Sequence, residues 1–129
     1  MKAYDIEIIL SRQLAETLSI PIFITDPEGT LLFYNESAEE ILGERFEDTG
    51  EMKVEVWGTI FKPIDESGNI LSPDDLPLVK TLKNRKPNHG SFWIESLKGE
   101  KYKLYVTAYP LIGRGSRFLG AVAIFWTNT

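Results

Sequence analysis

The stretch over residues 22–43, IFITDPEGTLLFYNESAEEILG, constrains the fold of this chain more than any other part of it. Residues 20–25 form a β-branched and apolar run, which is typical of a buried strand. Pro27 and Gly29 follow in a turn, where proline fixes φ near about −65° and glycine tolerates positive φ. The chain can therefore reverse at once into a second strand over residues 30–34, so the pattern predicts a β-hairpin.

The same stretch closes with a short helix. Asn35 stands where its side-chain oxygen can accept a hydrogen bond from a backbone N–H of the first helical turn. Residues 37–42 then predict the helix itself, and Gly43 is placed to end it in the left-handed conformation. Strand, turn, strand and helix are therefore expected in immediate succession.

An amphipathic helix is predicted ahead of the hairpin, over residues 5–18. Its apolar side chains recur three or four positions apart and so form one stripe along a helix. The stripe contains Ile6, Ile9, Leu10, Leu14 and Leu18. We expect this helix to pack against a surface, because its apolar face is stabilised by burial.

The rest of the chain supplies further helices and three more strands. Residues 45–69 are irregular and predict short helices and loops. Ser72 and Pro73 suit the entry of a long helix over residues 74–85, with serine as the cap and proline at the first position, although Pro77 leaves the position of the first turn open. Strands are expected at residues 90–96, 101–111 and 118–127, the first two joined by a turn at residues 97–100.

These elements predict an α+β fold, with a five-stranded antiparallel sheet, helices on one face and an N-terminal amphipathic cap helix. In the strand over residues 101–111, Leu104 and Val106 alternate with Tyr105 and Tyr109, so the first pair is expected to face inward. The last strand is apolar on both sides, and both faces of the sheet therefore need cover. The apolar stripe of the N-terminal helix can supply the second cover.

Composition excludes several classes of function. The 129 residues include no cysteine, which excludes thiol nucleophiles, thiolate metal sites and cysteine photoadducts. The net charge of −5 argues against a nucleic-acid partner, because that affinity comes from lysine and arginine contacts to phosphate. No apolar run reaches the roughly 20 residues of a membrane span, and the N-terminus does not resemble a signal peptide. One cytoplasmic domain with no membrane partner is expected.

Several short segments, taken in order, carry a resemblance to a known family. They are residues 24–26 with Gly29, then 34–35, 38–43, 64–68, 71–78, 109–111 and 118–122. In this order the chain resembles a PAS domain over about residues 14–129. The resemblance implies residues 1–19 as a cap or dimerisation helix and residues 20–129 as the PAS domain.

The resemblance also implies a function in sensing and signal transduction. The expected output is a domain such as a histidine kinase or a transcription regulator. A homodimer is expected through the N-terminal helix and the outer sheet face near Tyr105, Tyr109 and Trp126. The family's final strand often ends in an Asp-Ile-Thr triplet, and the matching residues here are Thr127, Asn128 and Thr129, so the aspartate is missing.

A ligand cavity between the sheet and the helices is the expected site. Aromatic walls with a polar handle suit a small organic ligand. The candidate contacts are Phe33, Asn35, Trp57, Phe61, Leu78, Leu82, Trp93, Leu104 and Val106. The alternative is that the aromatic residues only fill the core and that Asn35 only caps its helix.

The identity of any cofactor is left open by the sequence. His89 is the only histidine, and it lies outside the helix over residues 74–85 on which haem-binding PAS sensors place their ligand. A flavin is possible, but the photochemical cysteine of the light-sensing relatives is absent. The carboxylates Asp65, Glu66, Asp74 and Asp75 suit a turn and a helix start better than a metal site.

Two other functions compete with a ligand sensor. One is a small isomerase or hydratase of the cone-shaped α+β kind, with His89 and a carboxylate such as Asp26 or Glu95 as an acid–base pair. The other is a PAS-fold assembly module that binds no ligand. No catalytic residue and no metal ligand is assigned in the leading interpretation.

Overall fold

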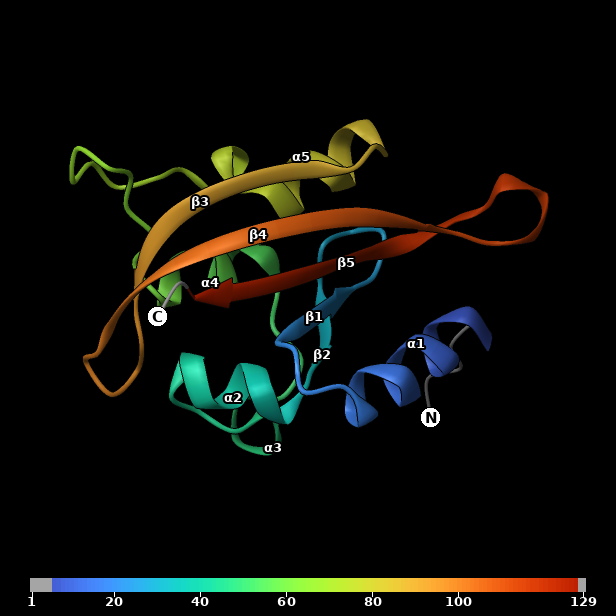
Figure 1. The fold of residues 1–129 in the computed structure, drawn as a ribbon. Coiled ribbons are helices and arrows are strands. Elements are labelled where there is room, and N and C mark those ends of the chain that lie inside the picture. The colour runs from blue at the N-terminus through green and yellow to red at the C-terminus, as the bar shows by residue number, and fades with distance from the viewer. Residues whose placement is uncertain (1–5, 128–129) are drawn as a thin grey trace.

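The computed structural model describes residues 6–127, which form an α+β fold around one five-stranded antiparallel sheet (Figure 1). The strands are β1 (Ile22–Thr25), β2 (Leu31–Tyr34), β3 (Asn88–Glu95), β4 (Lys101–Ile112) and β5 (Phe118–Thr127). Their order across the sheet is β2-β1-β5-β4-β3. The hairpin of β1 and β2 thus pairs with the last strand of the chain, and the predicted fold class is confirmed.

The helices cover both faces of this sheet. They are α1 (Ile6–Thr17), α2 (Glu36–Leu42), α3 (Phe46–Thr49), α4 (Val54–Ile60) and α5 (Pro77–Asn84), with two 3₁₀ turns at Pro73–Asp75 and Arg114–Ser116. Figure 1 shows α5 beyond β3 and β4, whereas α1 lies beside the β1 and β2 end. In the described part of the chain, no helix has both the length and the apolar character needed to cross a membrane.

Alternation along the strands divides the buried residues between two cores. The inner core lies between the sheet and helices α2 to α5, and it contains Phe23, Tyr34, Trp57, Phe61, Leu78, Leu104, Val106 and Phe125 among others. The outer core lies between the sheet and α1, and it contains Ile8, Ala15, Ile22, Ile24, Leu32, Phe33, Leu119 and Val122. α1 does cover the second sheet face, as predicted, but the predicted stripe was wrong: Ile8 and Ala15 are buried against the sheet, whereas all five stripe residues are exposed. The helix carries apolar residues on more than one side, so burial of one side leaves the other in solvent.

The predicted helix after the hairpin is also confirmed. Asn35 has an extended backbone, and its side-chain oxygen accepts a hydrogen bond from the Ala38 N–H at 3.1 Å. Gly43 ends the helix with φ of 82°, in the left-handed region, and its N–H donates to the Glu39 carbonyl. Cap and stop therefore lie where the side-chain chemistry of these residues requires them.

The prediction of a long helix over residues 74–85 was wrong about where the helix begins. Ser72 does accept a hydrogen bond from the Asp74 N–H, but the helix that it caps is the short 3₁₀ turn. Leu76 then adopts an extended conformation with ψ of 137°, and α5 begins at Pro77. The cause is steric, because a proline disfavours helical backbone in the residue that precedes it.

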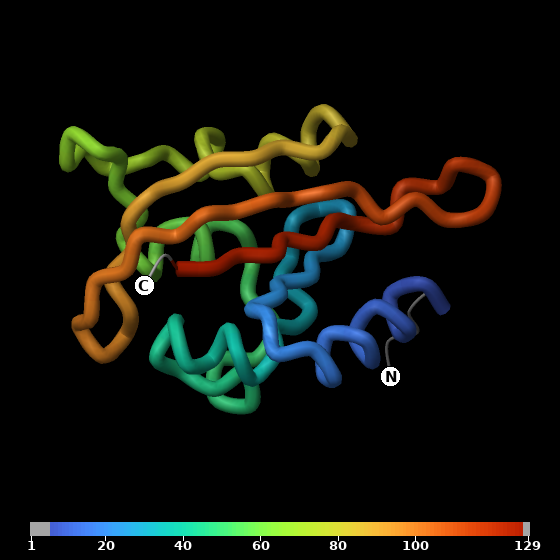
Figure 2. Tube along the Cα trace, viewed as in Figure 1, coloured from blue at the N-terminus to red at the C-terminus, as the bar shows by residue number. Residues whose placement is uncertain are grey.

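The predicted strands shift by one or two residues at their ends. β1 begins at Ile22 instead of residue 20, since Pro21 has no N–H to donate to the sheet and only its carbonyl pairs, with the Phe125 N–H at 3.1 Å. Asp5, the predicted start of the first helix, lies outside the described residues, as do Asn128 and Thr129. Figure 2 shows the β3–β4 turn and the β4–β5 loop at opposite ends of the sheet.

Candidate ligand cavity

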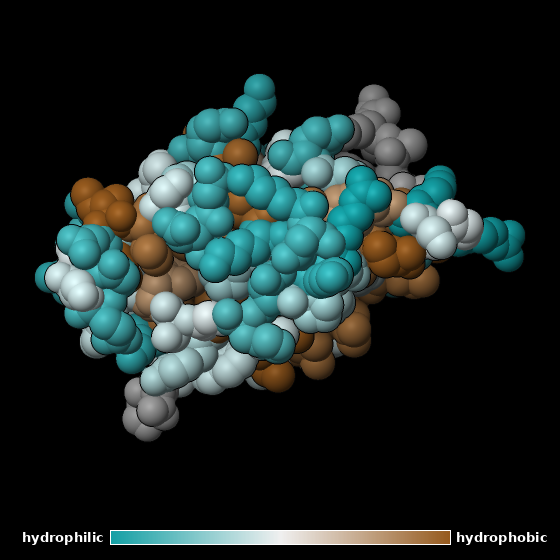
Figure 3. Space-filling view, turned by 90° about the horizontal axis from the view of Figure 1, so that it is seen from above, coloured by the Kyte–Doolittle hydropathy of each residue, from teal (hydrophilic) through white to brown (hydrophobic). Residues whose placement is uncertain are grey.

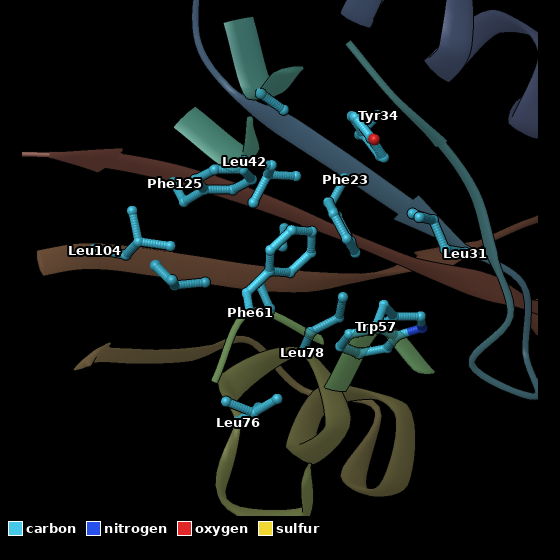
Figure 4. Close-up of a cluster of buried hydrophobic side chains, with 14 of the residues drawn as sticks. Phe23, Leu31, Tyr34, Leu42, Trp57, Phe61, Leu76, Leu78, Leu104 and Phe125 are labelled. Carbon is cyan, nitrogen blue, oxygen red and sulfur yellow. The ribbon is translucent and has the colours of Figure 1, made fainter. Parts of the chain in front are cut away.

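A small cavity lies within the inner core, between the sheet and the helices. Its volume is about 70 Å³. Figure 4 shows the side chains of Phe23, Phe61, Leu78 and Phe125 directed toward one another around this part of the core. The complete lining is Phe23, Leu42, Trp57, Phe61, Pro63, Leu76, Pro77, Leu78, Phe92, Ile94, Leu104, Val106, Ala123 and Phe125.

The walls come from strands and helices that are distant in sequence. On the sheet side, Val106 on β4 pairs directly with Phe125 on β5, and both side chains face inward. Ala123, two residues earlier on β5, faces the same way but carries only a methyl group. Opposite, α4 contributes Trp57 and α5 contributes Leu78. The cavity is therefore a place where a small side chain leaves the layers incompletely filled.

Aromatic contacts hold one wall of the cavity in position. The ring of Phe23 stacks on Tyr34 with a centroid separation of 5.7 Å and meets Trp57 edge-on at 5.6 Å. The same ring meets Phe125 edge-on at 6.2 Å. These are the offset and edge-to-face arrangements that aromatic quadrupoles favour. The wall therefore has a defined geometry.

The cavity offers no free hydrogen-bonding group from a side chain of its lining. All fourteen lining residues are apolar apart from the Trp57 indole N–H. That N–H donates to the carbonyl oxygen of Gly29 at 2.8 Å and is thus already paired. What the cavity supplies to a guest is hydrophobic contact, and its chemistry does not favour a water molecule, which needs polar partners.

Five of the nine residues predicted from the sequence lie in the lining of this cavity. They are Trp57, Phe61, Leu78, Leu104 and Val106. The structure brings them together from two helical segments and one strand. The other four, Phe33, Asn35, Leu82 and Trp93, lie elsewhere.

Phe33 and Asn35 belong to the α1 side of the molecule. Phe33 pairs with Ile24 in the β1–β2 ladder and faces the outer core, where the Arg12 guanidinium lies 4.4 Å from its ring centroid. Asn35 is buried at the start of α2 and donates to the carbonyls of Ala15 and Ile20. Neither side chain reaches the cavity.

Trp93 and Leu82 lie outside the cavity because of their positions on β3 and α5. Trp93 lies between two cavity-lining residues on β3, Phe92 and Ile94, so its side chain points to the opposite face. Leu82 lies one turn beyond Leu78 on α5 and lines a separate surface groove with Gly29. The inward face of β3 therefore belongs to the residues on either side of Trp93.

Sequence reasoning missed several lining residues, of which Phe23, Leu42 and Phe125 are examples. Phe23 stands between Ile22 and Ile24, so apolar residues on both sides concealed which face it occupies. Phe125 lies in a strand that is apolar throughout, which concealed it in the same way. Leu42 could have been found, because it is the last apolar residue before the helix-ending Gly43.

The cavity does not fit a haem or a flavin. Pockets for ligands of that size occupy about 300–1,000 Å³, several times the volume of this one, and the lining contains no histidine to ligate iron and no free polar side chain to hold the edge of a flavin ring. His89 is exposed on β3, where its Nδ1 lies 2.9 Å from the Thr107 hydroxyl oxygen. It is not one of the residues that line the cavity.

The carboxylates that could have formed other sites have local partners. Asp26 accepts hydrogen bonds from the N–H groups of Glu28 and Thr30, and Glu95 pairs with Lys62 at 2.8 Å. The His89–carboxylate pair required by the isomerase alternative is thus not formed with either residue.

Three of the four carboxylates weighed for a metal also have local partners. Asp65 accepts from two N–H groups of its own turn, and Asp74 pairs with Lys83. The hydrogen bond from Lys103 lowers the pKa of Glu66. Over residues 6–127, no group of three or more histidine, aspartate or glutamate side chains is arranged to hold a metal ion.

The fold is shared with known proteins. A family model described as "PAS domain" matches residues 10–77, more than half of the chain. The PAS domain of Bordetella pertussis BvgS superposes with a TM-score of 0.63 at 17% identity, covering 95% of this chain and 86% of that one.

Two further solved structures show the same fold. The PAS domain of an HTR-like protein from Haloarcula marismortui gives a TM-score of 0.62 at 19% identity, with 95% and 94% of the two chains covered. The Rhodobacter sphaeroides LOV protein gives 0.75 at 12% identity, covering 97% of this chain and 69% of that one. No curated protein matches the sequence.

Proposed function

The chain belongs to the PAS domain family, and from this premise we propose that it is a sensory module whose self-association responds to occupancy of the inner cavity. PAS domains are in general sensory and signalling modules. The proposed ligand contacts are the five predicted residues that line the cavity, with Phe23, Leu42 and Phe125. The output that the family implies is a histidine kinase or a transcription regulator.

The observation that carries this proposal is that α1 is apolar on two sides. Ile8 and Ala15 are buried against the sheet and belong to the outer core. Ile6, Leu10 and Leu14 lie on another side of the helix, where Leu10 is 55% exposed and Leu14 is 59% exposed. Exposed apolar residues in a row at four-residue intervals on a helix suit burial against a partner.

The partner that suits this row is a second copy of the chain. A two-fold interface places the same surface of two copies against itself, so a continuous apolar row is self-complementary. The net charge of −5 on each copy opposes association, so a homodimer requires an apolar contact of this kind. Residues 1–19 are thus proposed as the dimerisation element and residues 20–129 as the sensory domain.

The outer sheet face extends this surface beyond α1. The Phe125 N–H donates a hydrogen bond to the carbonyl of Pro21. The residues next to these two in the chain, Trp126 and Ile20, are both exposed and are brought near each other by this bond. Trp126 stacks on Tyr105 with a centroid separation of 6.2 Å. The proposed interface therefore runs from Leu10 and Leu14, past Ile20, to this aromatic pair.

Other parts of the surface suit an interface less well. Figure 3, which looks onto the β3 and α5 side, shows a surface that is mostly hydrophilic across its centre. Ile70 is 84% exposed, but its loop neighbours Ser67, Gly68 and Asn69 are polar or lack a side chain. This isolated residue provides a matched control.

Sedimentation or light scattering over a range of concentrations tests the proposal. Wild-type protein is expected to dimerise, and Leu10→Glu or Leu14→Glu is expected to weaken the dimer at least about tenfold, because each buries a charge at the interface. Ile70→Glu makes the same chemical change outside the proposed surface and should leave association unaltered. A wild-type monomer at high concentration would overturn the dimer, as would equal effects of all three variants.

A further inference from the structure

We propose that the inner cavity takes a compact nonpolar molecule smaller than benzene, such as a small hydrocarbon or an apolar gas, and rejects planar polar cofactors. This inference rests on the proposed function, since it names the class of ligand for the same site. It follows from the size of the cavity, the chemistry of its wall and the packing that fixes both.

The volume of the cavity sets an upper limit on the size of the ligand. The cavity of about 70 Å³ is about half the volume of an engineered apolar cavity of roughly 150 Å³ that binds benzene or xenon. A ligand with a ring system would require several wall residues to move. A molecule with only a few heavy atoms, or a single xenon atom, fits without displacement of the wall.

The chemistry of the cavity wall determines the polarity of the ligand. The only side-chain N–H or O–H group in the lining is the Trp57 indole N–H, which is already bonded to Gly29. A carboxylate or an amide that entered would lose its hydrogen bonds to water without replacing them, which is unfavourable in an apolar interior. A nonpolar guest loses none and gains contact with aliphatic and aromatic carbon.

Packing around the cavity preserves this selectivity. Phe23 contacts both Trp57 and Phe125 through edge-on ring geometry, so the sheet and α4 are held at a fixed separation. Leu78 lines the cavity from α5 and is not one of the rings that make these contacts. Shortening it should therefore enlarge the cavity and change which guest is accepted.

Methyl-detected NMR of the whole chain with dissolved xenon tests the inference directly. We expect saturable shifts in the methyl groups of Leu42, Leu78, Leu104 and Val106, which line the cavity. Leu119 and Val122 belong to the outer core and do not line it, so their methyl groups serve as the internal control. Equal shifts in both sets, or none in the lining set, would overturn the inference.

Benzene tests the predicted upper limit on ligand size. Wild-type protein should show no saturable benzene shifts, whereas Leu78→Ala should bind benzene at least about tenfold more tightly, because the truncated side chain leaves a larger cavity. Benzene binding to wild-type protein, or a stoichiometric complex with flavin mononucleotide, would overturn the size limit. The wild-type xenon measurement remains decisive if Leu78→Ala fails to fold.

The outcome also separates this inference from the proposed function. Saturable xenon binding with an unchanged dimerisation constant would support the ligand class and overturn coupling between cavity and association. A dimer that depends on Leu10 and Leu14, without xenon shifts in the lining residues, would overturn the ligand class and leave dimerisation standing.

Discussion

The side-chain amide of Asn35 donates a hydrogen bond to the carbonyl oxygen of Ala15 at 2.9 Å, and so joins the start of α2 to the last turn of α1. Its second donor bond goes to the carbonyl of Ile20 at 2.8 Å. Its side-chain oxygen accepts from the N–H groups of Ile22 and Ala38. One buried side-chain amide thus links α1, β1 and α2. Its N–H groups bond to the α1 side, and its oxygen bonds to β1 and α2.

Replacement of Asn35 by aspartate should release α1 selectively. The carboxylate can still accept from Ile22 and Ala38, but it has no proton to donate to Ala15 or Ile20. We expect a loss of at least about 1–3 kcal/mol in the free energy of unfolding. Hydrogen exchange should quicken in α1 while α2 keeps its protection.

Asn35→Ala is the matched comparison for that experiment. It removes the cap of α2 as well as the donors, which adds about 1 kcal/mol of destabilisation, and it should quicken exchange in both helices. If aspartate and alanine loosen α2 equally, or if neither loosens α1, the division of roles within the Asn35 side chain is wrong.

Gly120 should tolerate no side chain. Its φ is 137°, and a Cβ built there would lie 2.0 Å from the carbonyl oxygen of Thr25, a backbone atom that cannot move aside without parting β1 from β5. Gly120→Ala should therefore destabilise the protein by more than about 3 kcal/mol in denaturant unfolding. Gly99→Ala is the control, since Gly99 also has positive φ but no atom within 4 Å of the added carbon. Its cost should stay near about 1 kcal/mol.

Thr25 offers a stabilising substitution. Its side chain is fully buried, and its hydroxyl has no hydrogen-bond partner among the described residues. Valine has nearly the same shape and buries no polar atom, so Thr25→Val should raise the free energy of unfolding by about 1 kcal/mol. Thr81 is also fully buried, but its hydroxyl donates to the carbonyl of Lys86 at 2.9 Å. Thr81→Val should destabilise, and a gain from both substitutions would contradict this explanation.

Tyr34 should make stability fall at alkaline pH. Burial raises the pKa of its phenol above the ordinary value of about 10. The unfolded chain then loses this proton at a lower pH than the folded one, so the contribution to stability is complete below about pH 10 and is lost as pH rises through the raised pKa. Burial raises the pKa of Tyr109 as well, which adds to the same alkaline loss.

Tyr34→Phe tests this assignment. The variant loses the hydrogen bond to the carbonyl of Glu44, which should cost about 0.5–1.5 kcal/mol at neutral pH. Above pH 10 its stability should fall less steeply than that of wild type, as measured by denaturant unfolding at several pH values. Parallel stability curves for the two proteins up to pH 11 would show that Tyr34 does not titrate as described.

Local chemistry made much of the fold predictable. The β1–β2 hairpin, the Asn35 cap and the Gly43 stop follow from side-chain and backbone preferences that act within a few residues. Alternation placed Leu104 and Val106 correctly because polar and apolar positions differ clearly along β4. Alternation gives no such guide for Phe33 and Phe23, because their strands are apolar on both sides and the ladder shifts register between Ile24 and Thr25.

The sequence by itself determined the α+β class, the order of the elements and the presence of the first helix, since each depends on residues that are neighbours along the chain. Only the tertiary structure decided which apolar residues share a cavity, how large it is and which side of α1 remains exposed. These properties depend on how side chains from β1, β4, β5 and the helices fill a common volume. The small side chain of Ala123 leaves a gap beside its ladder partner Phe23, and Trp57 and Leu78 close that gap from the helices. The second role of Asn35 was likewise hidden, because its partners Ala15 and Ile20 come within reach only after α1 has folded back onto the sheet.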